Sequence, residues 1–154
     1  MPEIRPVTRA NWKELIRLKV REEQTHFVAS NLYSIAESQF GEEFEGLWDF
    51  HPFGIYDDAG TPVGFLMYGF NFEHPRHQAF IMRLMVDEKQ QGKGYGRFGM
   101  QKMLEVFRPD ERIRTVAISY EPENESARKL YASLGFVETG EMVGEEILAL
   151  LQLR

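Results

Sequence analysis

The sequence predicts a mixed α/β fold whose sheet begins with antiparallel strands. Two stretches rich in aromatic and apolar residues, 53–56 and 63–70, flank the segment from Asp57 to Gly60, whose composition is typical of a hairpin turn. Further along the chain, apolar residues recur at helical spacing from Arg97 and again from Ala127. The chain therefore contains both strands and amphipathic helices, and a strand hairpin precedes the two best-defined helices.

The first third of the chain contains shorter elements. Ile4 to Val7 is predicted to form a strand, and Thr8 to cap a helix that includes Trp12 and Lys19. A second helix is expected from Ser34 to Phe40. Between Gly41 and Pro52, acidic and aromatic residues alternate without a clear period, which predicts a loop.

The second half of the chain is more regular. Ala79 to Val86 is predicted to return as the central strand after a turn at 73–78. The helix from Arg97 ends before Pro109, which cannot continue it, and the later helix ends at Gly135. The remaining predicted strands are Thr115–Ser119, Phe136–Thr139 and Ile147–Leu153.

Length and composition set further bounds. The 154 residues are expected to form one domain, 1–154, with a real hydrophobic core. No apolar run approaches the roughly 18 residues of a membrane span, no signal-peptide pattern opens the chain, and cysteine is absent. The formal charge of −6 argues against nucleic-acid binding and suits a cationic substrate. We expect a cytoplasmic enzyme with no nucleic-acid or membrane partner.

The most informative segment is Gln91–Gly96, QGKGYG, which lies between an apolar strand and an amphipathic helix. Glycines at alternate positions let the backbone approach a ligand closely and turn several N–H groups into one concavity. A helix that begins there adds the positive end of its dipole. The segment is therefore suited to holding a pyrophosphate.

Two other phosphate-binding motifs fit this segment less well. The P-loop pattern places Ser or Thr after Gly-Lys, whereas Gly94 follows Lys93 here, so the magnesium ligand is missing. Gly94, Gly96 and Gly99 match the spacing of the dinucleotide fingerprint, and Glu121 lies where a ribose-binding acid could sit. That fingerprint directly follows the first strand of a βαβ unit, whereas hairpin-like strands come first here. The sequence therefore disfavours a Rossmann domain.

Two motifs together resemble those of the GNAT superfamily of N-acetyltransferases. Gln91-x-x-Gly94-x-Gly96 is similar to the family's pyrophosphate loop, and the segment from Asn124 to Phe136 resembles Asn-x-x-Ala-x-x-Leu-Tyr-x-x-Leu-Gly-Phe. The resemblance covers nearly the whole chain. It implies a mixed α+β GNAT fold, with a mostly antiparallel mixed sheet of about six to seven strands flanked by about four helices. It also implies transfer of acetyl from acetyl-CoA to an amine.

The resemblance assigns coenzyme-binding roles to three parts of the chain. Main-chain groups at the end of the central strand are expected to pair with the pantetheine arm, and one N–H to stabilise charge on the thioester oxygen. The glycine-rich segment would cradle the pyrophosphate, with added charge from Lys93 and Arg97. Asn124 would contact the pantetheine or diphosphate, cap a helix, or do both. The predicted cofactor-binding residues are Leu84, Met85, Val86, Gln91, Gly92, Lys93, Gly94, Tyr95, Gly96, Arg97 and Asn124.

Catalytic roles follow from the same resemblance. The family's tyrosine at the position of Tyr131 lies near the coenzyme sulfur and protonates the departing thiolate, whereas periodicity alone indicates a helix-packing residue. Some polyamine acetyltransferases of the family carry an acid where this chain has Met82, which cannot accept a proton. The general base therefore stays open between a water held by backbone groups and Glu22, Glu23, Glu73 or Glu121.

The N-terminal half bears on the acceptor. The segments 21–37 and 54–69 resemble the substrate side of bacterial spermine/spermidine acetyltransferases, and Glu22, Glu23 and Glu37 are predicted to bind a small cationic amine. Further carboxylates that suit a polyamine groove are Glu42, Glu43 and Asp49, beside Phe27, Tyr33, Phe44 and Trp48. A solvated acidic helix face would have a similar composition. Three functions stay open: polyamine N-acetylation, acetylation of another small amine or a protein N-terminus, and a non-catalytic acyl-CoA sensor.

Two further expectations concern histidines and assembly. His74 and His77 lie three residues apart in a Pro-containing turn with no third ligand nearby, so surface histidines are predicted and no metal site. The apolar C-terminal strand, 147–153, is a candidate for pairing across a homodimer.

Overall fold

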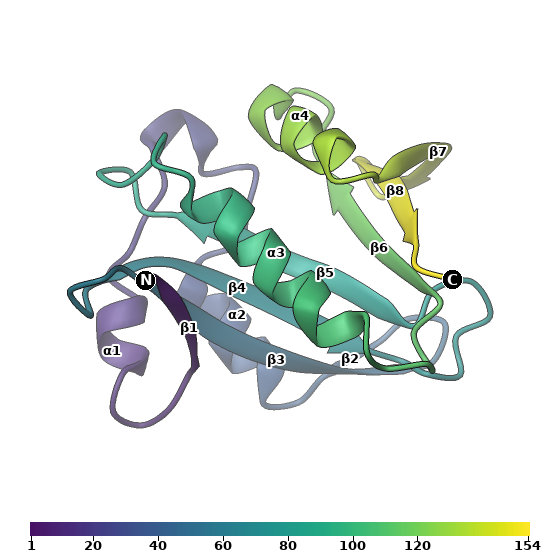
Figure 1. The fold of residues 1–154 in the computed structure, drawn as a ribbon, viewed down its shortest axis with the longest axis horizontal. Coiled ribbons are helices and arrows are strands. Elements are labelled where there is room, and N and C mark those ends of the chain that lie inside the picture. The colour runs from purple at the N-terminus through teal and green to yellow at the C-terminus, as the bar shows by residue number, and fades with distance from the viewer.

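The computed structural model describes residues 1–154 and forms one mixed sheet with helices on both faces (Figure 1). Its elements are β1 (Glu3–Pro6), α1 (Trp12–Leu15), a 3-10 helix η1 (Glu22–Gln24), α2 (Asn31–Ser38), β2 (Glu42–Glu43), β3 (Leu47–Tyr56), β4 (Pro62–Phe70), β5 (Ala79–Val86), α3 (Tyr95–Phe107), β6 (Thr115–Tyr120), α4 (Glu125–Ser133), β7 (Val137–Val143) and β8 (Glu146–Gln152). None of the helices is long and apolar enough to cross a membrane.

The sheet has eight strands, one or two more than expected. Its order is β1-β3-β4-β5-β6-β8-β7, with β2 paired to β3 beside this path. Only β5 and β6 run parallel, and the other neighbours are antiparallel. The prediction of a mixed α+β fold with a mostly antiparallel sheet and about four helices is confirmed.

The predicted loop between Gly41 and Pro52 is wrong in its second half. Strand β3 begins at Leu47, because Trp48 and Phe50 point into the core while Leu47 and Asp49 stay exposed. This is the period of two that a strand requires. The neighbouring Glu42 and Glu43 form the short strand β2, which pairs back onto β3.

Two hydrophobic clusters fill the two faces of the sheet. The larger cluster lies under α3, which crosses one face (Figure 1), and includes the fully buried Met100, Met103 and Phe107. The smaller cluster surrounds Trp48 on the other face, where α2 covers it. Gly99 lets α3 approach the sheet closely, because a Cβ there would lie only 3.0 Å from Ile55 Cδ1. This third glycine of the apparent dinucleotide fingerprint therefore has a packing role.

The central strands β5 and β6 separate toward their carboxyl ends. They pair only where 79–81 of β5 lies beside 116–118 of β6. Just beyond, Met82 is an extra residue in β5, because Arg83 and Ile81 face consecutive residues of β4. Such a bulge bends a strand and increases its local twist. The last residues of β5 therefore have no strand partner on the β6 side, and an opening forms between the two strands.

The expectation that the C-terminal strand could pair across a dimer is wrong. Strand β8 lies inside the sheet, with β6 along one edge and β7 along the other. Both rows of its main-chain groups therefore face strands of the same chain, and no free edge remains for a second copy. The strand at that end of the sheet is β7, whose residues are mostly exposed.

Candidate functional site

Two adjoining cavities occupy the opening between β5 and β6. The first, of about 450 Å³, is bordered by the glycine-rich segment, and we call it the loop cavity. The second, of about 630 Å³, contains Glu37, Glu42 and Glu146, and we call it the acidic cavity. Both cavities are lined by Phe27, Val28, Leu84, Asn124 and Tyr131. Two ligands, one bound in each cavity, would therefore contact each other beside these five residues.

The glycine-rich segment presents an unusual row of free N–H groups. No backbone N–H from Gln91 to Arg97 donates to a backbone carbonyl, because the segment forms no ladder and the first turn of α3 has no preceding turn. Gly92 and Gly94 have φ values of 80° and 90°, and a Cβ at either residue would meet nothing within 4 Å. Open backbone N–H groups at a helix N-terminus form a cradle for an anion. This cradle fits a pyrophosphate.

Most of the predicted cofactor-binding residues come together here. The loop cavity is lined by Leu84, Met85, Val86, Gln91, Gly92, Gly94, Tyr95, Gly96 and Asn124. Lys93 and Arg97 do not line it, because their side chains turn to Gln90 Oε1, at 2.9 Å, and Ser133 Oγ, at 2.8 Å. The cradle in this structure is therefore made of main-chain groups, and these two cations lie beside it.

Gln24 is a residue of this site that the sequence did not indicate. Gln91 Nε2 donates to Gln24 Oε1 at 2.8 Å and to the Val86 carbonyl at 3.1 Å. These bonds join the end of β5, the glycine-rich segment and η1, so Gln91 acts as a brace as well as a lining residue. The link spans 67 residues of sequence and carries no local signal.

Tyr131 lies where the two cavities meet. It is 7% exposed and packs with Tyr120 and Phe136, so the helix-packing interpretation holds. It also lines both cavities. Burial, with smaller contributions from Tyr120 and Glu146, raises the pKa of Tyr131 above its ordinary value, which keeps the hydroxyl protonated at neutral pH. Its proton is therefore available to a group in either cavity.

Asn124 combines two positions that the sequence left open. Its Oδ1 accepts from the Ala127 N–H at 3.4 Å, as expected of the N-cap of α4. The residue also lines both cavities. Capping fixes the side chain at the start of α4 and so places its amide beside the opening.

The acidic cavity joins carboxylates from three elements with aromatic and apolar walls. Glu37 comes from α2, Glu42 from β2 and Glu146 from β8, while Phe27, Phe44 and Met82 line the same space. Glu146 did not stand out in the sequence, because it directly follows Glu145 and the short turn that leads into β8. Glu22, Glu23, Glu73 and Glu121 line neither cavity. Of the three predicted substrate-binding acids, the structure therefore brings only Glu37 to the site.

Glu37 is paired inside this cavity. Arg83 Nη2 lies 3.2 Å from its Oε1, and both side chains are largely buried. Burial raises the pKa of the Glu37 carboxyl, Arg83 opposes this, and the neighbouring Glu42 adds to it. Arg83 also donates to the Met82 carbonyl at 2.8 Å, which helps to hold the bulge. The pair therefore ties α2 to the central strand.

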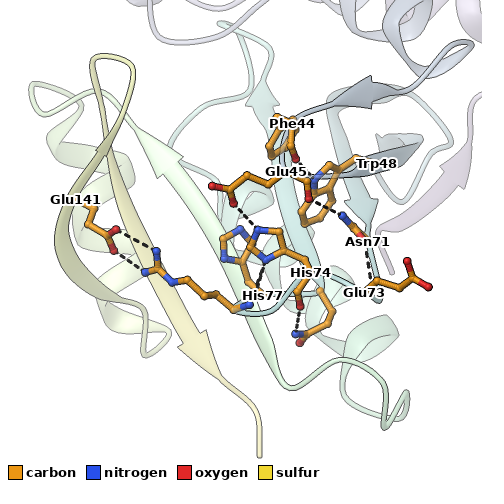
Figure 2. Close-up of polar contacts among 10 residues, drawn as sticks. Phe44, Glu45, Trp48, Asn71, Glu73, His74, His77 and Glu141 are labelled. Carbon is orange, nitrogen blue, oxygen red and sulfur yellow. Dashed lines mark hydrogen bonds and ion pairs between the residues drawn. The ribbon is translucent and has the colours of Figure 1, made fainter.

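The prediction of surface positions for His74 and His77 is wrong, because both side chains are buried. Figure 2 shows Glu45 directed at His74, whose Nε2 lies 2.7 Å from Glu45 Oε2. His74 Nδ1 accepts from the backbone N–H of His77 at 3.1 Å, so Nε2 carries the hydrogen and donates it to Glu45 in a hydrogen bond. Burial, aided by His74, lowers the pKa of His77 from 6.5 to about 4 and keeps it neutral. No group of three or more possible metal ligands forms here.

This histidine cluster supports one wall of the acidic cavity. Glu45 has a left-handed backbone, with φ of 51°, a conformation that costs about 1–2 kcal/mol. His74 holds its side chain, Asn71 Nδ2 donates to its carbonyl at 3.3 Å, and the Phe44 carbonyl accepts from Trp48 Nε1 at 3.0 Å (Figure 2). Phe44 and the preceding Glu42 both line the cavity, so the cluster fixes the turn that places them.

Replacing His74 by Phe is expected to weaken this wall. The change removes the bond to Glu45 and leaves two backbone N–H groups without their acceptor, so the free energy of unfolding should fall by about 1–3 kcal/mol. Denaturant melts of the wild type and the variant measure this fall. His51→Phe is the control, because His51 is partly exposed and lines neither cavity. Equal effects of the two substitutions would contradict the supporting role.

Comparisons with known proteins agree with this geometry. Residues 12–136 match the model of the acetyltransferase (GNAT) family. A spermine/spermidine N(1)-acetyltransferase of Bacillus subtilis is 25% identical over 151 residues, covering 94% of this chain and 95% of that protein.

Solved structures show the same fold at low identity. Spermidine N-acetyltransferase from Vibrio cholerae, in complex with CoA and spermine, superposes with a TM-score of 0.73 at 17% identity, covering 99% of this chain and 95% of that one. The ribosomal-protein-S18-alanine N-acetyltransferase from Escherichia coli gives 0.68 at 16% identity, with 99% and 94% covered. With a family match over most of its length and a pyrophosphate cradle at the opening, the chain belongs to the acetyltransferase (GNAT) family and is an N-acetyltransferase that uses acetyl-CoA.

Proposed function

We propose that residues 1–154 act as one catalytic domain that transfers acetyl to a primary amine of a polyamine of the spermidine or spermine type. The observation that carries this proposal is the acidic cavity, which adjoins the loop cavity at Tyr131. Its lining contains three carboxylates, on Glu37, Glu42 and Glu146, and one guanidinium, on Arg83. The excess negative charge favours an acceptor that carries more than one positive charge. The spermine/spermidine acetyltransferase relative supports the same acceptor class.

The walls of the cavity suit the rest of such a molecule. Methylene groups between the ammonium nitrogens need apolar or aromatic surfaces, and cations are attracted to aromatic faces. Phe27 and Phe44 line the cavity, and Phe44 stacks on Trp48 with ring centroids 5.1 Å apart. Met82 adds an apolar surface at the bulge. The cavity thus offers both carboxylates and apolar surface to an acceptor whose charged nitrogens are separated by methylene chains.

On the donor side, each group has a role set by its position. The free N–H groups from Gln91 to Arg97 hold the pyrophosphate. The end of β5, Leu84 to Val86, has no strand partner on the side of the opening, so its main-chain groups can pair with the pantetheine arm and stabilise developing charge on the acetyl oxygen. Tyr131 keeps its proton at neutral pH and gives it to the thiolate as the amine bonds to the acetyl carbon. Both substrates are bound together when this occurs.

Glu42→Gln tests the acceptor class. Removing this partly solvated charge should raise the KM for spermidine about two- to fivefold, because an exposed ion pair contributes about 0.2–1 kcal/mol. The KM for butylamine, which carries a single charge, should change less, since it has no second ammonium group to pair. Glu43→Gln is the matched control, because Glu43 is the adjacent residue of β2 and lines neither cavity. A wild-type enzyme with no preference for spermidine over butylamine would contradict the proposal.

A further inference from the structure

Resting on the proposed function, we infer that Glu146, held by Ser119, is the group that accepts the proton of the attacking ammonium nitrogen. Glu146 is the first residue of β8 and lines the acidic cavity. The Ser119 hydroxyl, on the neighbouring strand β6, donates to Glu146 Oε1 at 2.8 Å. The carboxylate is therefore fixed on the β6 side of the opening and keeps Oε2 free to accept a proton.

Its place in the sheet puts Glu146 opposite the predicted site of the acetyl group. Glu146 shares a sheet face with Leu148, two residues on, and Leu148 belongs to the cluster on the α2 face. Tyr131 approaches from the other face as part of the cluster under α3. The two residues line the same cavity because β5 and β6 separate beyond Ile81 and Ile118. The acceptor amine thus has a carboxylate on one side and the phenol that protonates the leaving group on the other.

Other titratable groups of the cavity are less suited to this step. Glu37 is paired with Arg83, Glu42 is solvent-exposed on β2, and His26 is exposed beside Phe27. Glu146 instead lines the cavity together with Tyr131 and is held there by Ser119, which lines it too. The groups that face Glu146 from the packed elements are Ser119 and Tyr120 of β6, Tyr131 of α4, and Glu37, Glu42, Arg83 and His26 across the cavity.

The proton balance of the step is as follows. The ammonium nitrogen passes one proton to the Glu146 carboxylate, directly or through one water, and becomes a neutral amine. Its lone pair then forms the bond to the acetyl carbon and displaces the sulfur, which receives the Tyr131 proton. The second nitrogen proton, lost as the amide forms, restores Tyr131 through water, and Glu146 returns its proton to solvent. One proton is released in total for each acetyl group transferred.

Glu146→Gln is expected to lower kcat for spermidine by about 100-fold near pH 7, as loss of a general base commonly does. The deficit should shrink as the pH approaches 10, where a primary amine loses its proton without help. Calorimetry on the coenzyme A complex should show spermidine affinity reduced by less than about fivefold, which separates a proton acceptor from a binding charge. Glu145→Gln is the matched control, because Glu145 is the exposed neighbour and lines neither cavity.

Each outcome separates this inference from the proposed function. If the wild type acetylates spermidine and Glu146→Gln keeps kcat within threefold at every pH, the base assignment fails while the polyamine function stands. A raised KM with unchanged kcat at all pH values likewise overturns it and makes Glu146 a binding residue. Ser119→Ala, which leaves the carboxylate in place, should lower kcat less than Glu146→Gln and with the same pH trend. A wild type inactive on all polyamines overturns the proposed function, and the base assignment with it.

Discussion

Tyr131→Phe is expected to lower kcat by about 10²- to 10⁴-fold, the range typical of a lost general acid. The substitution removes one hydroxyl and keeps the ring, so packing with Tyr120 and Phe136 is preserved. The free energy of unfolding and the affinity for coenzyme A should therefore stay close to those of the wild type. Steady-state assays of amine acetylation measure kcat, denaturant melts measure the free energy of unfolding, and calorimetry measures the affinity for coenzyme A.

Tyr33→Phe is the control for this substitution. Tyr33 undergoes the same change on the exposed side of α2 and lines neither cavity. Full activity of Tyr131→Phe would remove the general-acid role from this residue and leave the fold and the coenzyme site untouched. A lower kcat accompanied by a clear fall in the free energy of unfolding would instead make Tyr131 a packing residue.

Gly94→Ala should weaken coenzyme A binding by about 10- to 100-fold. Gly94 has a φ of 90°, so an alanine there either takes on strain of about 1–2 kcal/mol or pulls the backbone away from this conformation. Such a movement turns the neighbouring N–H groups away from the pyrophosphate, and each hydrogen bond to a charged group is worth about 1.5–3 kcal/mol. The dissociation constant from calorimetry is the quantity to compare.

Gly140→Ala provides a matched control for the backbone strain. Gly140 has a φ of 84° and, like Gly94, has nothing within 4 Å of an added Cβ, but it lies in β7 and outside both cavities. Both substitutions should lower the free energy of unfolding by similar amounts, and only Gly94→Ala should weaken coenzyme binding. Equal coenzyme affinities in the two variants would contradict the cradle.

Much of the fold could be predicted because the signals were local. The central strand, 79–86, matched its prediction at both ends, and Pro109 and Gly135 lie just beyond the ends of their helices. The start of β3 was missed because its alternation, Trp48 and Phe50 inward, is mixed with acids and glycine. Helix α1 ends at Leu15, before the expected Lys19, because the following residues belong to a loop that packs on the sheet. Helix propensity, which is a property of single residues, does not predict that packing.

The coenzyme half of the site was more predictable than the acceptor half. The glycine-rich segment and the α4 motif are contiguous, so a short stretch of sequence carries most of their geometry. The acidic cavity instead draws Glu37, Glu42 and Glu146 from three elements that meet only in the folded sheet. The burial of His74 depends in the same way on Glu45 and Trp48, more than 25 residues earlier in the chain. Residue periodicity along the chain does not predict such contacts between residues far apart in the sequence.

The central claim is acetyl transfer from acetyl-CoA to a polyamine, and thiol release tests it most directly. The chain has no cysteine, so it adds no background to a thiol reagent. Wild-type protein would be assayed with acetyl-CoA and spermidine, spermine, butylamine, an aminoglycoside, several amino acids and a peptide with a free N-terminus. We predict turnover with spermidine and spermine at a kcat/KM well above that for the other acceptors. Turnover with another acceptor in place of the polyamines, or with none of them, would contradict the account.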